Sequence, residues 1–315
     1  MGVGMRQINT FDIENSHAPT WKDAGLYSGI RGEENRAKFI KPNTNLEYVR
    51  NQPEWDGITI FTDRMLPMVK EVDSKIKVGL LMESPIVWGH IYDDIKKLED
   101  SFDLIFTHDK NLLSRDPLKY KFIPADWVSV EEESHGLHEK TRLVSKIYSL
   151  KGKTEYGGIG DRPLRHTVAE RFADRLDLFG EGSPKGTLDL KSDSLVDYMF
   201  SIPMENAIKD YYYTEKILDC FITGNVPIFF GARSVSTFFD ERGILFWNSL
   251  DELGTILKRI GPELYKEMEP YVKINYELAT KYIDADDTLC GFIDKCLENP
   301  KYDTMENYKY ENSKI

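Results

Sequence analysis

The densest group of residues that could do chemistry lies within residues 198–232. A strand-like run leads to Glu205, and Thr214-Glu215-Lys216 then begins an amphipathic helix, with Thr214 as a possible N-cap. Backbone N–H groups at a helix start attract anions, whereas a lysine in the first turn is disfavoured unless an anion lies nearby. Lys216 therefore predicts a phosphate-binding site. The alternative is an exposed lysine beside Glu215, an ordinary acidic residue of a first turn.

A second candidate is Glu83, which follows the apolar run 78–82. A carboxylate at the end of a buried strand could take the proton from an attacking hydroxyl, which is the work of a general base. The alternative is a purely structural turn, in which Ser84-Pro85 begins a helix.

A third candidate is a pair of arginines, Arg162 and Arg165, at the expected start of a helix. A guanidinium can bind a phosphate through two parallel hydrogen bonds. We favour Arg165 and keep Arg162 as the substitute; the alternative is an ordinary arginine on a helix surface. The preceding glycine-rich run, 157–160, lacks the spacing of the known nucleotide-binding loops.

These candidates must be positioned by alternating strands and helices. Short apolar strands separated by helical patterns are typical of parallel sheets, and ligands of such sheets bind at the carboxyl ends of the strands. We expect an α/β protein of two Rossmann-like αβα domains facing a cleft, with domains at 1–140 and 141–298 and a polar, loosely held tail at 299–315. The expected strands are 58–61, 78–82, 104–106, 120–123, 143–150, 176–179, 198–202, 226–230 and 244–247. The expected helices are 64–72, 90–98, 162–176, one from 214 and a helical region from about 249 to 298.

Three runs of the sequence resemble motifs of the family-10 glycosyltransferases, the α-1,3/1,4-fucosyltransferases. The most specific run contains Glu205-Asn206, then 212–216 (YYTEK), then 224–228 (GNVPI), in the order and spacing of that family. Residues 81–85 (LMESP) and 162–165 (RPLR) resemble two further family segments. The resemblance implies the glycosyltransferase-B fold and a soluble microbial or viral type, since no membrane anchor is recognisable.

The resemblance also implies a mechanism. Glu83 would be the catalytic base, and Arg165 and Lys216 would neutralise the diphosphate leaving group, which is electrostatic stabilisation of the transition state. The reaction would be a single-step, inverting and metal-independent transfer of a sugar, L-fucose from GDP-fucose, to a glycan hydroxyl. No cofactor is implied, because the GDP-sugar is a substrate.

The remaining implied roles concern the nucleotide-sugar pocket. Asn206 and Tyr212 would line it, and Glu215 would contact the ribose or the sugar. The sequence departs from the family pattern at Met204, where phenylalanine is usual, and at 207–208, where a polar pair is usual. These departures leave open a different donor, such as GDP-mannose or a UDP-sugar. A catalytically silent protein that binds sugar nucleotides or glycans is a further alternative.

Composition limits the remaining function classes. The 315 residues carry 41 Lys and Arg against 53 Asp and Glu, a net charge of −12, which argues against a nucleic-acid partner. We recognise no signal peptide or transmembrane segment, and the three cysteines suit a reducing compartment, so we expect a cytoplasmic protein. Asp284-Ala-Asp286 could imitate a metal-binding motif, but its place at a helix start favours capping, and we expect no metal. The expected acceptor is an oligosaccharide or a lipopolysaccharide-type glycan.

Overall fold

The computed structural model describes residues 6–11, 46–87, 89–148 and 162–311. The chain folds as two compact units, which are described separately here. Unit 1 comprises Met1–Asp126 and Asp284–Asn307, and unit 2 comprises Trp127–Ile283 and Tyr308–Ile315. This division differs from the domain boundaries expected after residues 140 and 298.

Unit 1 is built on a six-stranded parallel sheet with the strand order β2-β1-β3-β4-β5-β6. Its strands are β1 (Arg6–Phe11), β2 (Leu46–Arg50), β3 (Glu54–Thr62), β4 (Asp73–Leu81), β5 (Leu104–Thr107) and β6 (Tyr120–Phe122). The last four residues of β3 and of β4 are buried, as expected for parallel strands that are covered on both faces.

Helices cover the sheet of unit 1. One face carries a 3-10 helix, Asp63–Lys70, and the helices α1 (Gly89–Leu98) and α2 (Lys110–Arg115), whose apolar side chains share one core with the strands. The expected helix at 64–72 is thus a 3-10 helix, and it contains Pro67, which lacks the N–H that an α-helix would use.

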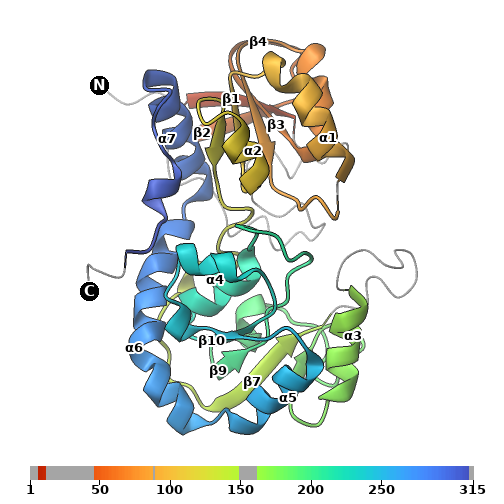
Figure 1. Cartoon of the computed structure of the whole chain (residues 1–315), viewed down its shortest axis with the longest axis vertical. Coiled ribbons are helices and arrows are strands. Elements are labelled where there is room, and N and C mark those ends of the chain that lie inside the picture. The colour runs from red at the N-terminus through yellow and green to blue at the C-terminus, as the bar shows by residue number, and fades with distance from the viewer. Residues whose placement is uncertain (1–5, 12–45, 88, 149–161, 312–315) are drawn as a thin grey trace. The chain divides into compact units, whose positions relative to one another are not determined.

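The last helix of the chain, α7 (Ala285–Glu298), belongs to unit 1 and lies beside its strands (Figure 1). Asp294 accepts two hydrogen bonds from Arg6 of β1, at 2.7 and 2.8 Å, and Asp286 accepts one from Tyr48 of β2, at 2.8 Å. The expected helix start at Asp284 is confirmed, because Asp284 occupies the N-cap position. Its side chain makes no capping hydrogen bond, however, and Asp286 bonds to the sheet.

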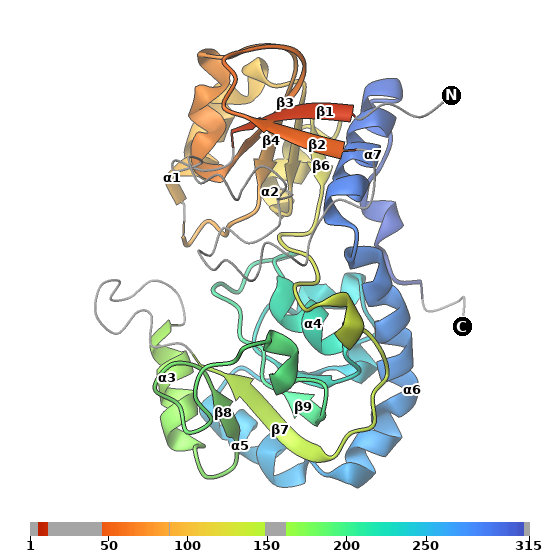
Figure 2. The same cartoon turned by 180° about the vertical axis from the view of Figure 1, so that it is seen from behind.

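Unit 2 contains a five-stranded parallel sheet in the order β11-β10-β9-β7-β8. Its strands are β7 (Arg142–Ile147), β8 (Asp177–Phe179), β9 (Tyr198–Ser201), β10 (Val226–Phe229) and β11 (Leu245–Phe246). Its helices are α3 (Arg162–Arg171), α4 (Glu215–Ile222), α5 (Leu250–Arg259) and α6 (Pro262–Ala279). Helix α6 runs along α4 and contacts β9 and β10 (Figure 2).

The segment from residue 299 to 311 is anchored, which differs from the loosely held tail expected from the sequence. In unit 1, Thr304 donates to the carbonyl of Phe122, and Lys121 donates to the carbonyls of Pro300 and Tyr302. In unit 2, Tyr308 is buried beside Tyr282.

Candidate functional site

The site in unit 2 is built on the backbone that follows β9. Met204 forms a parallel bridge with Phe230, and the N–H of Glu205 donates to the carbonyl of Phe230 at 2.9 Å. The segment after β9 is thus tied to the end of β10. Parallel strands bring their carboxyl ends to one edge of the sheet, so residues after β9 and β10 meet there.

Glu205 fixes the start of helix α4. Its buried carboxylate accepts hydrogen bonds from the N–H of Thr214, at 2.9 Å, and from the hydroxyl of Thr214, at 2.9 and 3.0 Å. Thr214 does occupy the N-cap position, but its hydroxyl bonds to Glu205 and does not cap the helix, in contrast to the sequence prediction. Glu205 thereby satisfies one of the N–H groups at the helix start.

Lys216 lies beside this carboxylate. Its Nζ donates to Thr214 Oγ1 at 2.6 Å and forms ion pairs with Glu215, at 3.3 Å, and Glu205, at 3.4 Å. Burial disfavours the charged amine, but the two carboxylates outweigh it and raise the pKa of Lys216 above its ordinary value. Lys216 is therefore a cation, and it is partly buried within an acidic pair.

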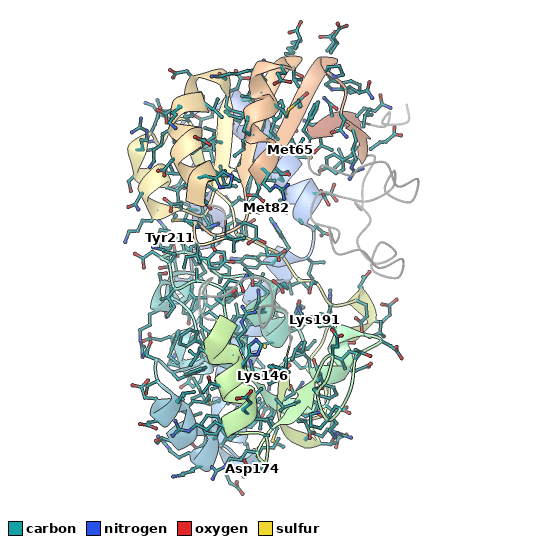
Figure 3. The ribbon with its side chains drawn as sticks, turned by 90° about the vertical axis from the view of Figure 1, so that its right-hand side faces the viewer. Met65, Met82, Lys146, Asp174, Lys191 and Tyr211 are labelled. Carbon is teal, nitrogen blue, oxygen red and sulfur yellow. The ribbon has the colours of Figure 1, made fainter. Side chains whose placement is uncertain are left out.

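A second lysine, Lys191, extends this network and escaped the sequence analysis (Figure 3). Its Nζ lies 2.5 Å from Asp219 and 3.6 Å from Glu215. Asp219 is buried and also accepts hydrogen bonds from the N–H and the hydroxyl of Ser129, both at 2.7 Å. The carboxylate of Glu215 is thus shared by two lysines.

Arg165 and Asn206 come together at the same edge of the sheet. Arg165, on α3, donates to the side-chain oxygen of Asn206 and to the carbonyl of Met204, the latter at 3.2 Å. Arg165 and Asn206 lie 41 positions apart in the sequence. The arrangement places a guanidinium next to an amide, a pair that suits a phosphate and its neighbouring hydroxyls.

Two other predicted donor residues are placed differently. Tyr212 is buried, with 2% of its surface exposed, so its ring lies in the interior of unit 2 and not on an open surface. Arg162 begins α3, but its side chain and the glycine-rich run 157–160 lie outside the described residues.

Lys146 of β7 is a second basic residue, after Lys191, that the sequence analysis did not single out. Its side chain is buried, and its Nζ lies 3.2 Å from the sulfur of Met204. Burial, and to a smaller extent the charge of Arg165, lowers the pKa of Lys146 to about 7. A lysine inside an apolar strand carries no local signal of a site, which is why the strand pattern concealed it.

Glu83 lies in unit 1, directly after β4. The N–H groups of Met82 and Glu83 donate to Asp63 Oδ1 at 2.9 and 3.2 Å, and the carbonyl of Glu83 accepts from the hydroxyl of Tyr92 at 2.6 Å. That hydroxyl lies 3.2 Å from His108 Nε2. The backbone of Glu83 is therefore held on both sides, while its half-buried carboxylate forms no hydrogen bond with the described residues.

Titratable groups around Glu83 have displaced pKa values. Burial raises the pKa of Asp63 to about 7, and the negative charge of Glu83 adds to this, against the two N–H bonds. Burial lowers the pKa of His108 to about 4, so its ring is neutral at physiological pH. The turn expected at 84–85 is present, since Val87 bonds back to Ser84, but helix α1 begins only at Gly89.

The described ranges contain no group of three His, Cys, Asp or Glu side chains arranged to hold a metal ion. No helix within them is both long and apolar enough to cross a membrane.

Comparison with known proteins finds similarity to fucosyltransferases. No family profile matches the chain. A stretch of 75 residues is 35% identical to an alpha-(1,4)-fucosyltransferase of Arabidopsis thaliana, covering 22% of this chain and 19% of that relative. The match thus spans about a fifth of the relative's length.

Solved structures share the fold over most of the chain. An alpha1,3-fucosyltransferase with GDP has a TM-score of 0.54 at 15% identity, over 93% of this chain and 90% of that one. An alpha1,3-fucosyltransferase with GDP-fucose has a TM-score of 0.53 at 15% identity, over 97% and 92%. TarM has a TM-score of 0.51 at 12% identity, over 76% and 54%. The predicted fold class, two α/β units of the glycosyltransferase-B type, and the resemblance to fucosyltransferases are confirmed.

Proposed function

We propose that this chain is a family-10 glycosyltransferase that transfers L-fucose from GDP-fucose to a hydroxyl of an oligosaccharide or lipopolysaccharide-type acceptor. The observation that carries the proposal is the meeting of Arg165 with Asn206 at the sheet edge where Lys216 lies in the first turn of α4. These residues come from three separate segments, and each stands at its position in the family motif. The fucosyltransferase structures with GDP and GDP-fucose share this fold.

The chemistry of the proposed site is the departure of GDP from the sugar. The diphosphate gains negative charge as the bond to the sugar breaks, and Arg165 and Lys216 supply positive charge to it. Preorganised charges of this kind lower the activation barrier by a few kcal/mol per group. Lys216 pairs with Glu205 and Glu215 before the donor binds. Those carboxylates keep the amine protonated and fix its position.

Glu83 is the proposed base. Its backbone is anchored by Asp63 and Tyr92, so the carboxylate is directed by a rigid turn. The base takes the proton of the acceptor hydroxyl while that oxygen attacks the sugar carbon and GDP leaves. Attack from the side opposite the leaving group inverts the configuration at that carbon. The proposal requires Glu83 and the cations of unit 2 to act on one substrate.

Three further residues complete the proposed donor site. Asn206 binds the donor together with Arg165, and Tyr212 forms part of the pocket wall. Glu215 accepts a hydrogen bond from a hydroxyl of the ribose or the sugar, since its carboxylate is held in place by Lys191 and Lys216. No metal takes part in the proposed reaction. We also keep the cytoplasm as the proposed location, in line with three buried thiols.

The direct test is release of GDP from GDP-fucose in the presence of an N-acetyllactosamine or lipopolysaccharide acceptor, with EDTA present. We expect turnover that depends on the acceptor and survives EDTA. Glu83→Gln should abolish turnover while GDP still binds. Glu71→Gln, which removes an exposed carboxylate of the same unit, is the matched control. Full activity of Glu83→Gln would remove Glu83 as the base.

A different donor is the second candidate, and residues around Asn206 motivate it. Met204 is buried, Ala207 is buried, and Ile208 is about half exposed, where the family usually has a phenylalanine and a polar pair. A thermal-shift panel of nucleotides and nucleotide sugars separates the two candidates, because a ligand at 100 times its dissociation constant adds about 2.7 kcal/mol of stability. Preference for GDP and GDP-fucose supports the first candidate, and preference for GDP-mannose or for UDP and a UDP-sugar supports the second. Tight binding without transfer to any acceptor would indicate a silent binding protein.

A further inference from the structure

Lys146 is buried in a way that differs from the other buried lysines of this chain. Only 2% of its surface is exposed, and the one acceptor that the described residues offer its Nζ is the sulfur of Met204 at 3.2 Å. A thioether is a weak hydrogen-bond acceptor, and a buried ammonium group without good acceptors is costly.

Burial also lowers the pKa of Lys140 to about 7, but the amine of this lysine has several backbone acceptors. Its Nζ donates to three backbone carbonyls, those of Leu195, Val196 and Thr223, at 3.4, 2.8 and 2.6 Å. It precedes β7, whereas Lys146 lies near the carboxyl end of that strand. Lys140, before the strand, thus donates to backbone carbonyls, whereas Lys146, near the end of the strand, has only a thioether as its acceptor among the described residues.

The surroundings of Lys146 are positive. Arg165, on α3, is the charged group that acts on it among the described residues. Figure 3 shows Lys146 beside α3. The other titratable groups packed at this edge are already paired: His166 of α3 with Tyr148, and Glu205 and Glu215 with Lys216.

Met204 links Lys146 to the proposed diphosphate site. Its sulfur contacts the amine of Lys146, and its carbonyl accepts from the guanidinium of Arg165 at 3.2 Å. Lys146 and Arg165 therefore both contact Met204. An anion that binds Arg165 would bring negative charge to within reach of a flexible lysine side chain.

We propose that Lys146 is a further binding residue for the diphosphate of the nucleotide, and that its amine takes up one proton from the solvent when that anion binds. This inference rests on the proposed function of the Arg165 site. Without the anion, the amine sits next to a guanidinium and a thioether, and the uncharged form is favoured. With the anion, the charged form gains a counter-ion. The amine lone pair forms a new N–H bond with a proton, and the acid form of the buffer loses that proton.

The linkage has a definite sign. Because burial lowers the pKa of Lys146 to about 7, about nine in ten of these amines are neutral at pH 8 in the unbound protein. Binding of a diphosphate raises this pKa, so affinity falls as the pH rises above 7. Between pH 8 and pH 9 the affinity for GDP should fall about fivefold, if the charged amine contributes about tenfold at pH 8. The terminal phosphate of GDP has a pKa near 6 and is fully ionised over this range.

The experiment is a calorimetric titration of the full chain with GDP at pH 8 in two buffers of different ionisation enthalpy. We expect the wild type to take up most of one proton per GDP bound. Lys146→Met should bind GDP about tenfold more weakly with almost no proton uptake. Lys146→Arg, which is charged at every pH used, should bind without uptake. Lys140→Met is the matched control and should keep the full uptake.

The outcomes separate this inference from the proposed function. Equal proton uptake by the wild type and Lys146→Met, or no uptake by the wild type, overturns the role of Lys146 while leaving the GDP site intact. Absence of GDP binding by the folded wild type contradicts the proposed function itself, and the inference then falls with it. The wild-type uptake is informative even if the methionine variant does not fold.

Discussion

The carboxylate of Glu205 holds both the N–H and the hydroxyl of Thr214, at 2.9 to 3.0 Å, in the interior of unit 2. This relationship fixes the start of α4 relative to the end of β9. It also provides Lys216 with a buried counter-ion at 3.4 Å. One side chain thus positions the helix start and the cation that the proposed site uses.

Removing the charge of Glu205 should therefore destabilise the protein. Glu205→Gln keeps an acceptor for the N–H of Thr214 but leaves Lys216 with one carboxylate fewer. Breaking a buried ion pair costs about 3 kcal/mol, and the retained hydrogen bond reduces this to about 2 kcal/mol. Urea unfolding measures the change. Glu263→Gln, at an exposed position, is the control, and equal stability of the two variants would contradict the anchoring role.

Asp63 should matter for catalysis without affecting donor binding. Its carboxylate accepts hydrogen bonds from the N–H groups of Met82 and Glu83 at 2.9 and 3.2 Å, so Asp63→Ala releases the turn that carries the proposed base. We expect kcat for sugar transfer to fall about 10- to 100-fold, since displacing a reacting group by about an ångström has this effect. The affinity for GDP should change less than twofold, because the proposed nucleotide site lies in unit 2.

A matched variant exists for this comparison. Asp103, just before β5 of the same sheet, also accepts a hydrogen bond from a backbone N–H, that of Lys77, at 2.7 Å. Asp103→Ala should leave kcat unchanged. If both aspartate variants lose activity equally, the effect of Asp63→Ala is general destabilisation and the positioning role is wrong.

The stability of the protein should depend on pH through Lys146. Burial lowers the pKa of this lysine from 10.5 to about 7, so the unfolded chain binds more protons than the folded one between these values. The free energy of unfolding therefore rises with pH across this range. Relative to Lys146→Met, the wild type should gain about 3 kcal/mol between pH 7 and pH 10. Denaturant unfolding at both pH values tests this, and parallel behaviour of the two proteins would show that Lys146 stays charged in the folded state.

Most of the fold follows from local patterns in the sequence. The runs 58–61, 104–106 and 226–230 are short, apolar and rich in β-branched or aromatic residues, and each forms a strand. Strand β1 was missed because its buried residues include Asn9 and Thr10. Asn9 is satisfied by Thr59 and Gln52, more than 40 positions away, which no local pattern reveals.

The site likewise contains residues that local sequence patterns reveal and residues whose partners are distant in the sequence. Arg165, Asn206 and Lys216 were found because they lie in runs with a recognisable order. The roles of Glu205 as an anchor and of Lys191 as a bridge depend on partners brought together only by folding: Lys191 meets Asp219, 28 positions away. The return of α7 to unit 1 depends on Arg6, 288 positions from Asp294. Contacts of this kind are set by the topology of the chain.

We propose that Arg165 binds the diphosphate of the donor, and titration of the wild type and of Arg165→Gln with GDP at pH 7 tests this role. Arg171→Gln is the control, because Arg171 is an exposed residue of the same helix that pairs with Asp251 at 2.8 Å. Loss of a charged hydrogen-bonding partner for phosphate costs about 2 kcal/mol, so we predict an affinity about 30-fold weaker for Arg165→Gln and no change for Arg171→Gln. Equal affinity of all three proteins for GDP would contradict the account.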